Sequence, residues 1–186
     1  MKAVWNSYES LYRHFEIAAV DEQRDDAMRK KYKGLAARFT CHSFILDLGL
    51  LYDALKELAN LSLMLQSTTI TIPQAQDAIN RTIRVLASFK EFPGEMLEEA
   101  NEAVKVGVFH NVHLHENAKM KSINANQFLQ SLVDNMRQRM CTFHNESSAK
   151  LIADMKVLYP DNWPQDVNIR HGEQEIRRLC RRFALN

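Results

Sequence analysis

The sequence is poor in the residues that interrupt helices and in the residue that forms disulfides. Only 5 of its 186 residues are glycine and 4 are proline, which favours long helices joined by few turns. The three cysteines, Cys41, Cys141 and Cys180, are odd in number and far apart. This pattern favours a reducing compartment over a disulfide framework.

Long apolar runs and targeting segments are also missing. No run reaches the roughly 18 apolar residues of a membrane span, and no signal peptide is recognisable, so we expect a soluble intracellular protein. The formal net charge of +1 argues against a general polyanion binder, although a local basic patch stays open. With 46% hydrophobic and 25% charged residues, the chain is suited to one globular domain with a hydrophobic core.

The strongest pattern that is present is the apolar period of residues 43–66, SFILDLGLLYDALKELANLSLMLQ. Leucines recur three and four positions apart, which predicts one long α-helix with an apolar side. The carboxylates of this helix are expected on its solvated surface. The candidate packing or interface stripe consists of Leu48, Leu51, Leu55, Leu58 and Leu65.

Most of the remaining chain keeps helical spacing as well. Helices are expected over 3–20, 73–89, 95–105, 128–140, 151–158 and 173–183, with a charged turn and short helix over 21–33 and a bend at Gly34. Residues 108–115 alternate instead, which predicts at most a short extended segment. The sequence therefore predicts a single all-α domain over 1–186, a multi-helix bundle around the long helix.

Two groups of residues have the composition of metal ligands. His110, His113 and His115 are spaced two and three residues apart, but alternation sends His110 to the opposite face, so we interpret them as a polar loop and leave metal binding open. Cys141 and His144 form a CxxH pair, to which Cys41 and His42 could add ligands. Because Cys141 follows a methionine-rich helical pattern, we interpret it as a buried thiol.

Catalytic motifs are missing from the sequence. It contains no glycine-rich phosphate loop, nucleophile elbow or Walker motif, and its carboxylates form no persuasive catalytic pair. We therefore assign no catalytic, cofactor-binding or metal-binding residue and expect a protein that is not an enzyme.

A basic cluster marks the last predicted helix: Arg177, Arg178, Arg181 and Arg182. These side chains could contact nucleic-acid phosphates. They are equally consistent with the solvated face of an amphipathic helix, where Glu173 and Glu175 lie within reach for ion pairs. The sequence favours the second interpretation, since no nucleic-acid motif accompanies the cluster.

Several blocks, in order, resemble the hAT superfamily of transposases, and most closely its domesticated vertebrate descendants in zinc-finger and SUMO-ligase-type proteins. The blocks are AVWNSYESLYRHF, FILDLGLLYDALKELANLSLMLQ, ITIPQAQDAINRTIRVL, LYPDNWP and HGEQEIRRLCRRF. In that family a large all-α insertion domain interrupts an RNase H-like core that holds metal ions with three acidic residues. The resemblance implies that this chain corresponds to the insertion domain.

The same resemblance places the catalytic residues outside this chain, the first two aspartates before Met1 and the glutamate beyond Asn186. Trp5 does not correspond to the family's tryptophan near the transposon end. The function implied is a non-catalytic, nuclear module for protein–protein interaction or self-association. The alternatives are a DNA-binding accessory domain that uses the arginine cluster, and a fragment of a SUMO ligase or transposase whose active residues lie elsewhere.

Overall fold

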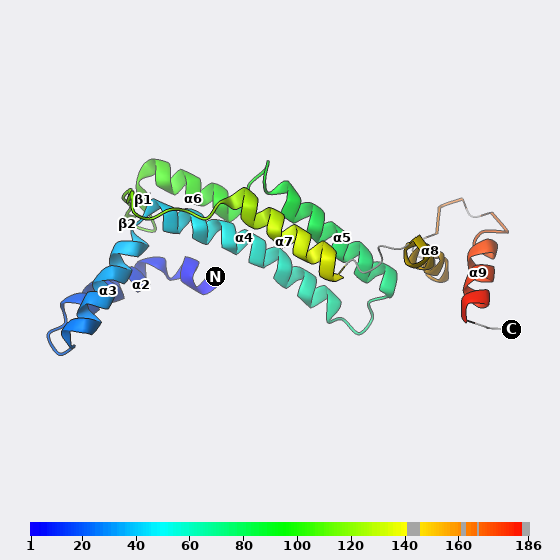
Figure 1. Ribbon diagram of the computed structural model, residues 1–186, viewed down its shortest axis with the longest axis horizontal. Coiled ribbons are helices and arrows are strands. Elements are labelled where there is room, and N and C mark those ends of the chain that lie inside the picture. Colours follow the sequence, from blue (N-terminus) through cyan, green and yellow to red (C-terminus); the bar gives the residue numbers. More distant parts are fainter. Residues whose placement is uncertain (141–145, 161–162, 167, 184–186) are drawn as a thin grey trace. The chain divides into compact units, whose positions relative to one another are not determined.

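The computed structural model describes residues 1–140, 146–160, 163–166 and 168–183, without the side chains of 146–148. The expected all-α class is confirmed (Figure 1). The elements are α1 (Lys2–Asn6), α2 (Tyr8–Val20), α3 (Asp26–Phe39), α4 (His42–Leu65), α5 (Ile72–Ser88), α6 (Glu95–Val106), β1 (Val108–Phe109), β2 (Val112–His113), α7 (Ala125–Met140), α8 (Glu146–Met155), the 3₁₀ helix η1 (Lys156–Leu158) and α9 (Glu173–Phe183).

Local sequence signals account for most of these boundaries. The long helix expected over 43–66 is α4, and Pro73 occupies the first turn of α5, where a missing N–H costs nothing. Thr71 and Gln74 cap α5 reciprocally: the Gln74 N–H donates to Thr71 Oγ1 at 3.3 Å, and the Thr71 N–H donates to Gln74 Oε1 at 3.0 Å. The expected bend at Gly34 is wrong, because α3 runs through it without interruption.

Contacts along the chain divide it into two compact units. Unit 1 comprises Met1–Asn60 and Val85–Leu132, and unit 2 comprises Leu61–Arg84 and Val133–Asn186. Helices α4, α5 and α7 contribute residues to both units. The single domain expected over 1–186 stays a prediction.

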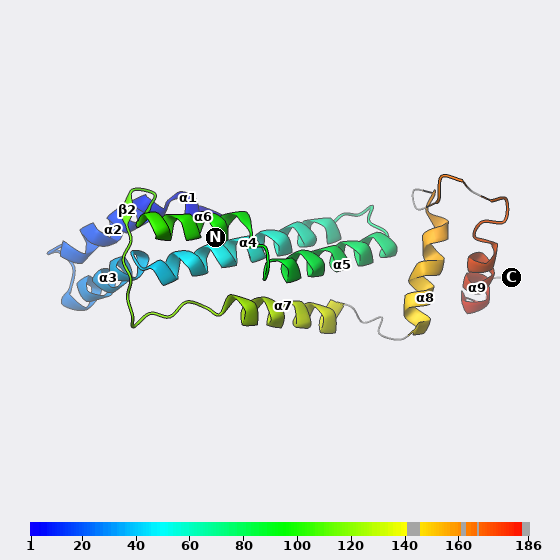
Figure 2. The ribbon, with the colours of Figure 1, turned by 90° about the horizontal axis from the view of Figure 1, so that it is seen from above.

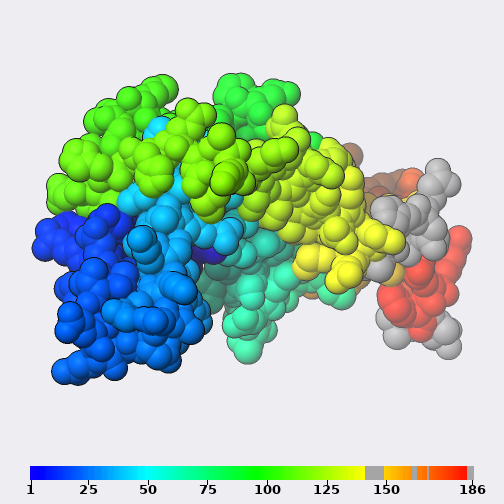
Figure 3. Space-filling model, turned by 60° about the vertical axis from the view of Figure 1, so that its left-hand side comes forward, coloured from blue at the N-terminus to red at the C-terminus, as the bar shows by residue number. Residues whose placement is uncertain are grey.

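The core of unit 1 is rich in aromatic rings. Trp5 and Tyr8 each meet Phe109 edge to face, with ring centroids 4.9 Å apart, and Tyr8 stacks on Phe39 at 5.1 Å. The Tyr8 hydroxyl donates a hydrogen bond to the Phe39 carbonyl, and burial raises the pKa of Tyr8. These contacts attach α1 and α2 to α3, and the blue residues of α2 and α3 lie against one another (Figure 3).

Helix α6 lies along the N-terminal half of α4 (Figure 2), and the close approach depends on a glycine. A Cβ on Gly49 would lie 2.7 Å from the Met96 carbonyl oxygen and 2.9 Å from the Leu97 Cα. One turn later, Asp53 is buried, 5% exposed, and its carboxylate accepts hydrogen bonds from the N–H groups of Met96 at 3.2 Å and Leu97 at 2.9 Å. Asp53 therefore caps the N-terminus of α6 from another helix.

This contact corrects the expectation that the carboxylates of α4 lie on its surface. Asp53 faces α6, and Gly94 leaves room for it, since a Cβ there would lie 2.4 Å from Asp53 Oδ2. Burial raises the pKa of Asp53, and the two backbone hydrogen bonds oppose that shift. Asp47 accepts a hydrogen bond from the Ile123 N–H at 2.7 Å. Both carboxylates thus satisfy backbone donors of segments far along the chain.

The buried side of α4 differs from the leucine stripe read from the sequence. Ile45, Leu48, Ala54 and Leu61 are buried, whereas Leu55 is 45% exposed. Of the other stripe residues, Leu51, Leu58 and Leu65 are half-buried. The difference arises because Gly49 and Asp53 determine which side of α4 faces α6, and neither residue contributes to an apolar periodicity.

The extended segment expected near 108–115 is a tight antiparallel hairpin. Val108 pairs with His113 and Phe109 with Val112, and His110 and Asn111 form the turn with φ of 43° and 63°. Two residues with positive φ are typical of the type I′ turn that connects twisted strands. The chain reverses at His110, so the expectation that a continuous strand places it opposite His113 and His115 is wrong.

In unit 2, α8 packs against η1 and α9. The buried apolar residues of these helices include Ile152, Val157 and Leu179. Gly172, with φ of +78°, precedes α9, and a Cβ there would lie 2.0 Å from Val157 Cγ2. The Trp163 indole N–H donates to the Val157 carbonyl at 2.8 Å. Val157 thus contacts both Trp163 and Gly172.

We predict that Asp53→Ala lowers the free energy of unfolding by about 1–3 kcal/mol, since it leaves two N–H groups at the start of α6 without their acceptor. Chemical denaturation followed by circular dichroism measures the change. Glu95→Ala is the matched control, because Glu95 is an exposed carboxylate in the first turn of the same helix. Equal losses for the two variants would contradict the capping role of Asp53.

Candidate anion-binding pocket between α8 and α9

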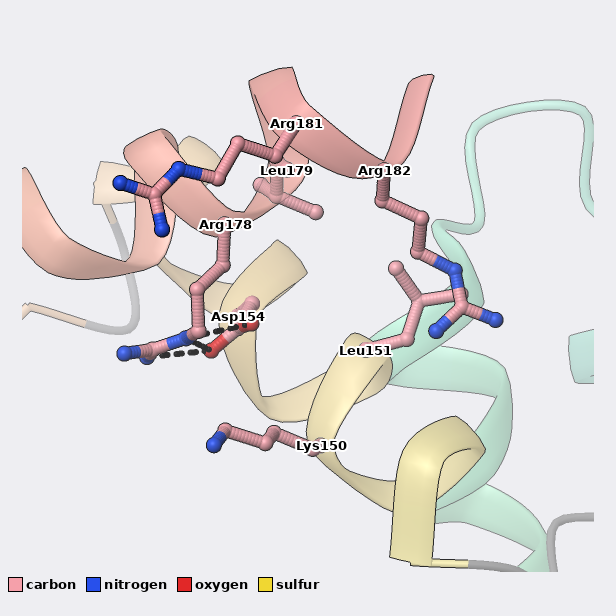
Figure 4. Close-up of a pocket in the computed structure, with 7 residues that line it drawn as sticks. All are labelled: Lys150, Leu151, Asp154, Arg178, Leu179, Arg181 and Arg182. Carbon is pink, nitrogen blue, oxygen red and sulfur yellow. Dashed lines mark hydrogen bonds and ion pairs between the residues drawn. The ribbon is translucent and has the colours of Figure 1, made fainter. Parts of the chain in front are cut away.

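A pocket of about 360 Å³ opens between α8 and α9 in unit 2 (Figure 4). Leu151 from α8 and Leu179 from α9 supply its apolar part. The polar lining residues are Lys150, Asp154, Arg178, Arg181 and Arg182. Three of the four arginines singled out in the sequence thus line one cavity, and the fourth, Arg177, lies outside it.

An ion pair between a buried carboxylate and a half-buried arginine joins the two helices. Asp154 is 6% exposed, and its carboxylate accepts hydrogen bonds from Arg178 Nε at 2.9 and 3.1 Å and from Arg178 Nη2 at 2.6 Å. This is the bidentate geometry that suits a guanidinium and a carboxylate. The hydrogen bonds from Arg178 lower the pKa of Asp154, despite its burial.

The sequence of α9 explains how it presents its charges. Leu179 is buried against α8. Helix α9 has Glu173 and Glu175 in its first turn and arginines in its last, and these charges interact favourably with the helix dipole. Arg177 pairs with Glu173 at 2.6 Å and Arg178 with Glu175 at 2.9 Å. The expected ion pairs with these two glutamates are therefore present.

The lining of the pocket has an excess of positive charge. Arg178 and Asp154 compensate each other, and Asp154 is the one carboxylate among the described lining residues. Lys150, Arg181 and Arg182 add positive charge beyond that pair. In Figure 4 the charged ends of Arg181 and Lys150 lie on the same side as that of Arg178, whereas that of Arg182 lies on the opposite side. An anion with several oxygens suits such a lining.

Sequence reasoning missed Lys150 and Asp154. They lie four residues apart on α8, a spacing that indicates one helix face, but nothing local connects that face to residues 178–182. The signal available in the sequence was a single carboxylate, Asp154, among the apolar residues Leu151, Ile152 and Met155. A carboxylate at such a position needs a cationic partner.

The histidines expected to form a polar loop do not converge. His110 lies in the hairpin turn with its Nε2 3.9 Å from Glu99 Oε1, His113 is exposed in β2, and His115 lies beside Cys41 with 3.8 Å between Nε2 and Sγ. Among the described residues, no three side chains of His, Cys, Asp or Glu are placed to hold a metal ion. Cys141 and His144 lie outside the described residues.

Searches of protein-family models, curated proteins and solved structures give no match to this chain. The resemblance to hAT transposases therefore stays a prediction. Within the described residues, none of the helices has the length and apolar character that a membrane span requires.

We predict that Arg178→Ala lowers the thermal unfolding midpoint more than Arg177→Ala does, because it leaves the buried Asp154 carboxylate without its cation. Since the pKa of Asp154 is lowered in the folded chain, the pair stabilises the fold above the ordinary carboxyl pKa, and this contribution is lost as the pH falls through the lowered value. The difference between the two variants should therefore shrink in acid. A difference that persists unchanged at the lowest pH would contradict this account.

Proposed function

We propose that this chain is a non-catalytic helical module that serves protein–protein interaction or self-association. The resemblance to the insertion domain of hAT transposases leads to this proposal, and it carries a nuclear location with it. The structural support is apolar surface on α4, the helix in which the resemblance is longest.

The observation that carries the proposal is an exposed apolar patch in unit 1. Leu55 is 45% exposed, Ala59 lies one turn further along α4 and is also exposed, and Tyr52 is half-buried beside them. With Met1 and the polar residues Lys2, Lys56 and Asn60, these residues line a hollow of about 280 Å³. A row of apolar residues one turn apart is what a partner helix packs against. Leu63, two turns beyond Leu55 on α4, belongs to unit 2 and is a separate exposed apolar residue, 68% exposed.

Self-association can be tested by size-exclusion chromatography with light scattering. We expect the wild type to show a mass above the 21.6 kDa of one chain at high concentration, and Leu55→Asp and Leu63→Asp each to lower it. Ile17→Asp is the control, since Ile17 is 69% exposed on α2, away from α4 in the sequence. A wild-type mass of 21.6 kDa at every concentration would refute self-association and restrict the proposal to another protein partner.

The pocket between α8 and α9 favours a second function, nucleic-acid binding through phosphate contacts. Lys150, Arg181 and Arg182 come from two helices and surround one cavity, with Arg178 held in place by Asp154. Because the net charge of the chain is only +1, such binding would be local and would involve few phosphates.

Affinity for duplex DNA at several salt concentrations tests this second function. Each phosphate contact adds about −0.9 to the slope of log K against log salt, so Arg181→Ala and Lys150→Ala should each weaken binding and reduce the slope by about 1. Lys105→Ala is the control, because Lys105 is an exposed cation on α6. No duplex binding at low salt, or equal losses for all three variants, would refute the pocket as a phosphate site.

A further inference from the structure

Three sulfur and nitrogen donors meet in unit 1 at the junction of α3 and α4. Cys41 lies between the two helices and forms a parallel bridge with His115, the residue that follows the hairpin by two positions. The His115 N–H donates to the Thr40 carbonyl at 2.8 Å, and the His42 N–H donates to the His115 carbonyl at 3.1 Å. These backbone hydrogen bonds fix the register that places the imidazole beside the thiol.

Cys41 Sγ lies close to the two other donor atoms. Cys41 Sγ is 3.8 Å from His115 Nε2 and 3.4 Å from Met120 Sδ. Met120 is held by a turn in which its N–H donates to the Asn117 carbonyl at 2.9 Å. Cys41 is fully buried, whereas His115 is exposed and Met120 half-buried, so the cluster has an open side.

The two separations from Cys41 Sγ, 3.8 Å to His115 Nε2 and 3.4 Å to Met120 Sδ, are close to those between ligands of one metal ion. Metal–sulfur bonds of about 2.3 Å and metal–nitrogen bonds of about 2.0 Å, arranged in a trigonal or tetrahedral geometry, leave about 3.5–4 Å between donor atoms. A shared ion requires side-chain rotations that direct His115 Nε2 and Met120 Sδ at a common point beside Cys41 Sγ. The thiol at present donates to the Ala37 carbonyl at 3.0 Å, a hydrogen bond that the metal would replace.

We propose that Cys41, His115 and Met120 bind a soft monovalent metal ion, Cu(I). A thiolate and a thioether select soft ions, and imidazole is also a good copper ligand. Zinc fits less well, because a thioether is a poor zinc ligand and a structural zinc site has four ligands, usually Cys and His. Binding displaces the proton of the Cys41 thiol to solvent, while His115 coordinates through a neutral Nε2.

The test is an anaerobic competition for Cu(I) between the full chain and a chromophoric chelator. The reference protein has Cys141→Ser and Cys180→Ser, so that Cys41 is its one remaining thiol. We expect it to bind one equivalent of Cu(I). Added to that background, His115→Gln and Met120→Leu should each weaken binding by at least the roughly 10- to 100-fold that loss of an outer-shell partner costs.

His113→Gln is the matched control, because His113 is exposed two residues away in β2 and should leave the affinity unchanged. Cys41→Ala should abolish binding, but it also removes a buried side chain and could impair folding. His115→Gln and Met120→Leu, which change an exposed and a half-buried residue, therefore decide the outcome. The proposal is overturned if the reference protein binds no Cu(I). It is overturned equally if His115→Gln and Met120→Leu leave the affinity at the reference value, since a thiol alone would then explain the binding.

Discussion

The buried carboxylate of Asp53 holds α6 against α4, and the rest of unit 1 depends on that contact. It satisfies two N–H groups that begin α6, and Gly49 lets the backbone of α6 approach α4 closely. Helix α6 ends at Gly107 in the left-handed conformation, so the hairpin follows immediately. Phe109 then reaches the core that Trp5 and Tyr8 form. One polar contact therefore positions elements that are far apart in the sequence.

The same geometry leads to the two kinds of surface on which the proposed functions rest. Because Gly49 and Asp53 turn one side of α4 toward α6, Leu55 lies on a side that stays exposed. In unit 2, Asp154 has a comparable role: it fixes Arg178 and so orients α9, which leaves further cations around the cavity. In both units a buried acidic residue determines which surface a helix presents.

Apolar periodicity predicts well where the helices of this chain lie in the sequence, and it predicts poorly which side of each helix is buried. The extent of α4, the start of α5 at Pro73 and the pairs of Arg177 and Arg178 follow from spacing within one element. The burial of Asp53 and the contact of Asp154 with Arg178 depend on residues 43 and 24 positions away, which no local pattern encodes. The position of Lys150 in the pocket could not be predicted for the same reason, since tertiary packing alone places it beside α9.

The contact between α4 and α6 limits which residues are tolerated together at positions 49, 53 and 94. A side chain at position 94 collides with the carboxylate of Asp53, and a side chain at position 49 displaces the helix that the carboxylate caps. The effects of substitutions at the three positions are therefore not additive. A larger residue at 94 becomes tolerable only after the carboxylate at 53 is lost. Evolutionary change at this contact is thus expected to be concerted, with the order of the steps constrained.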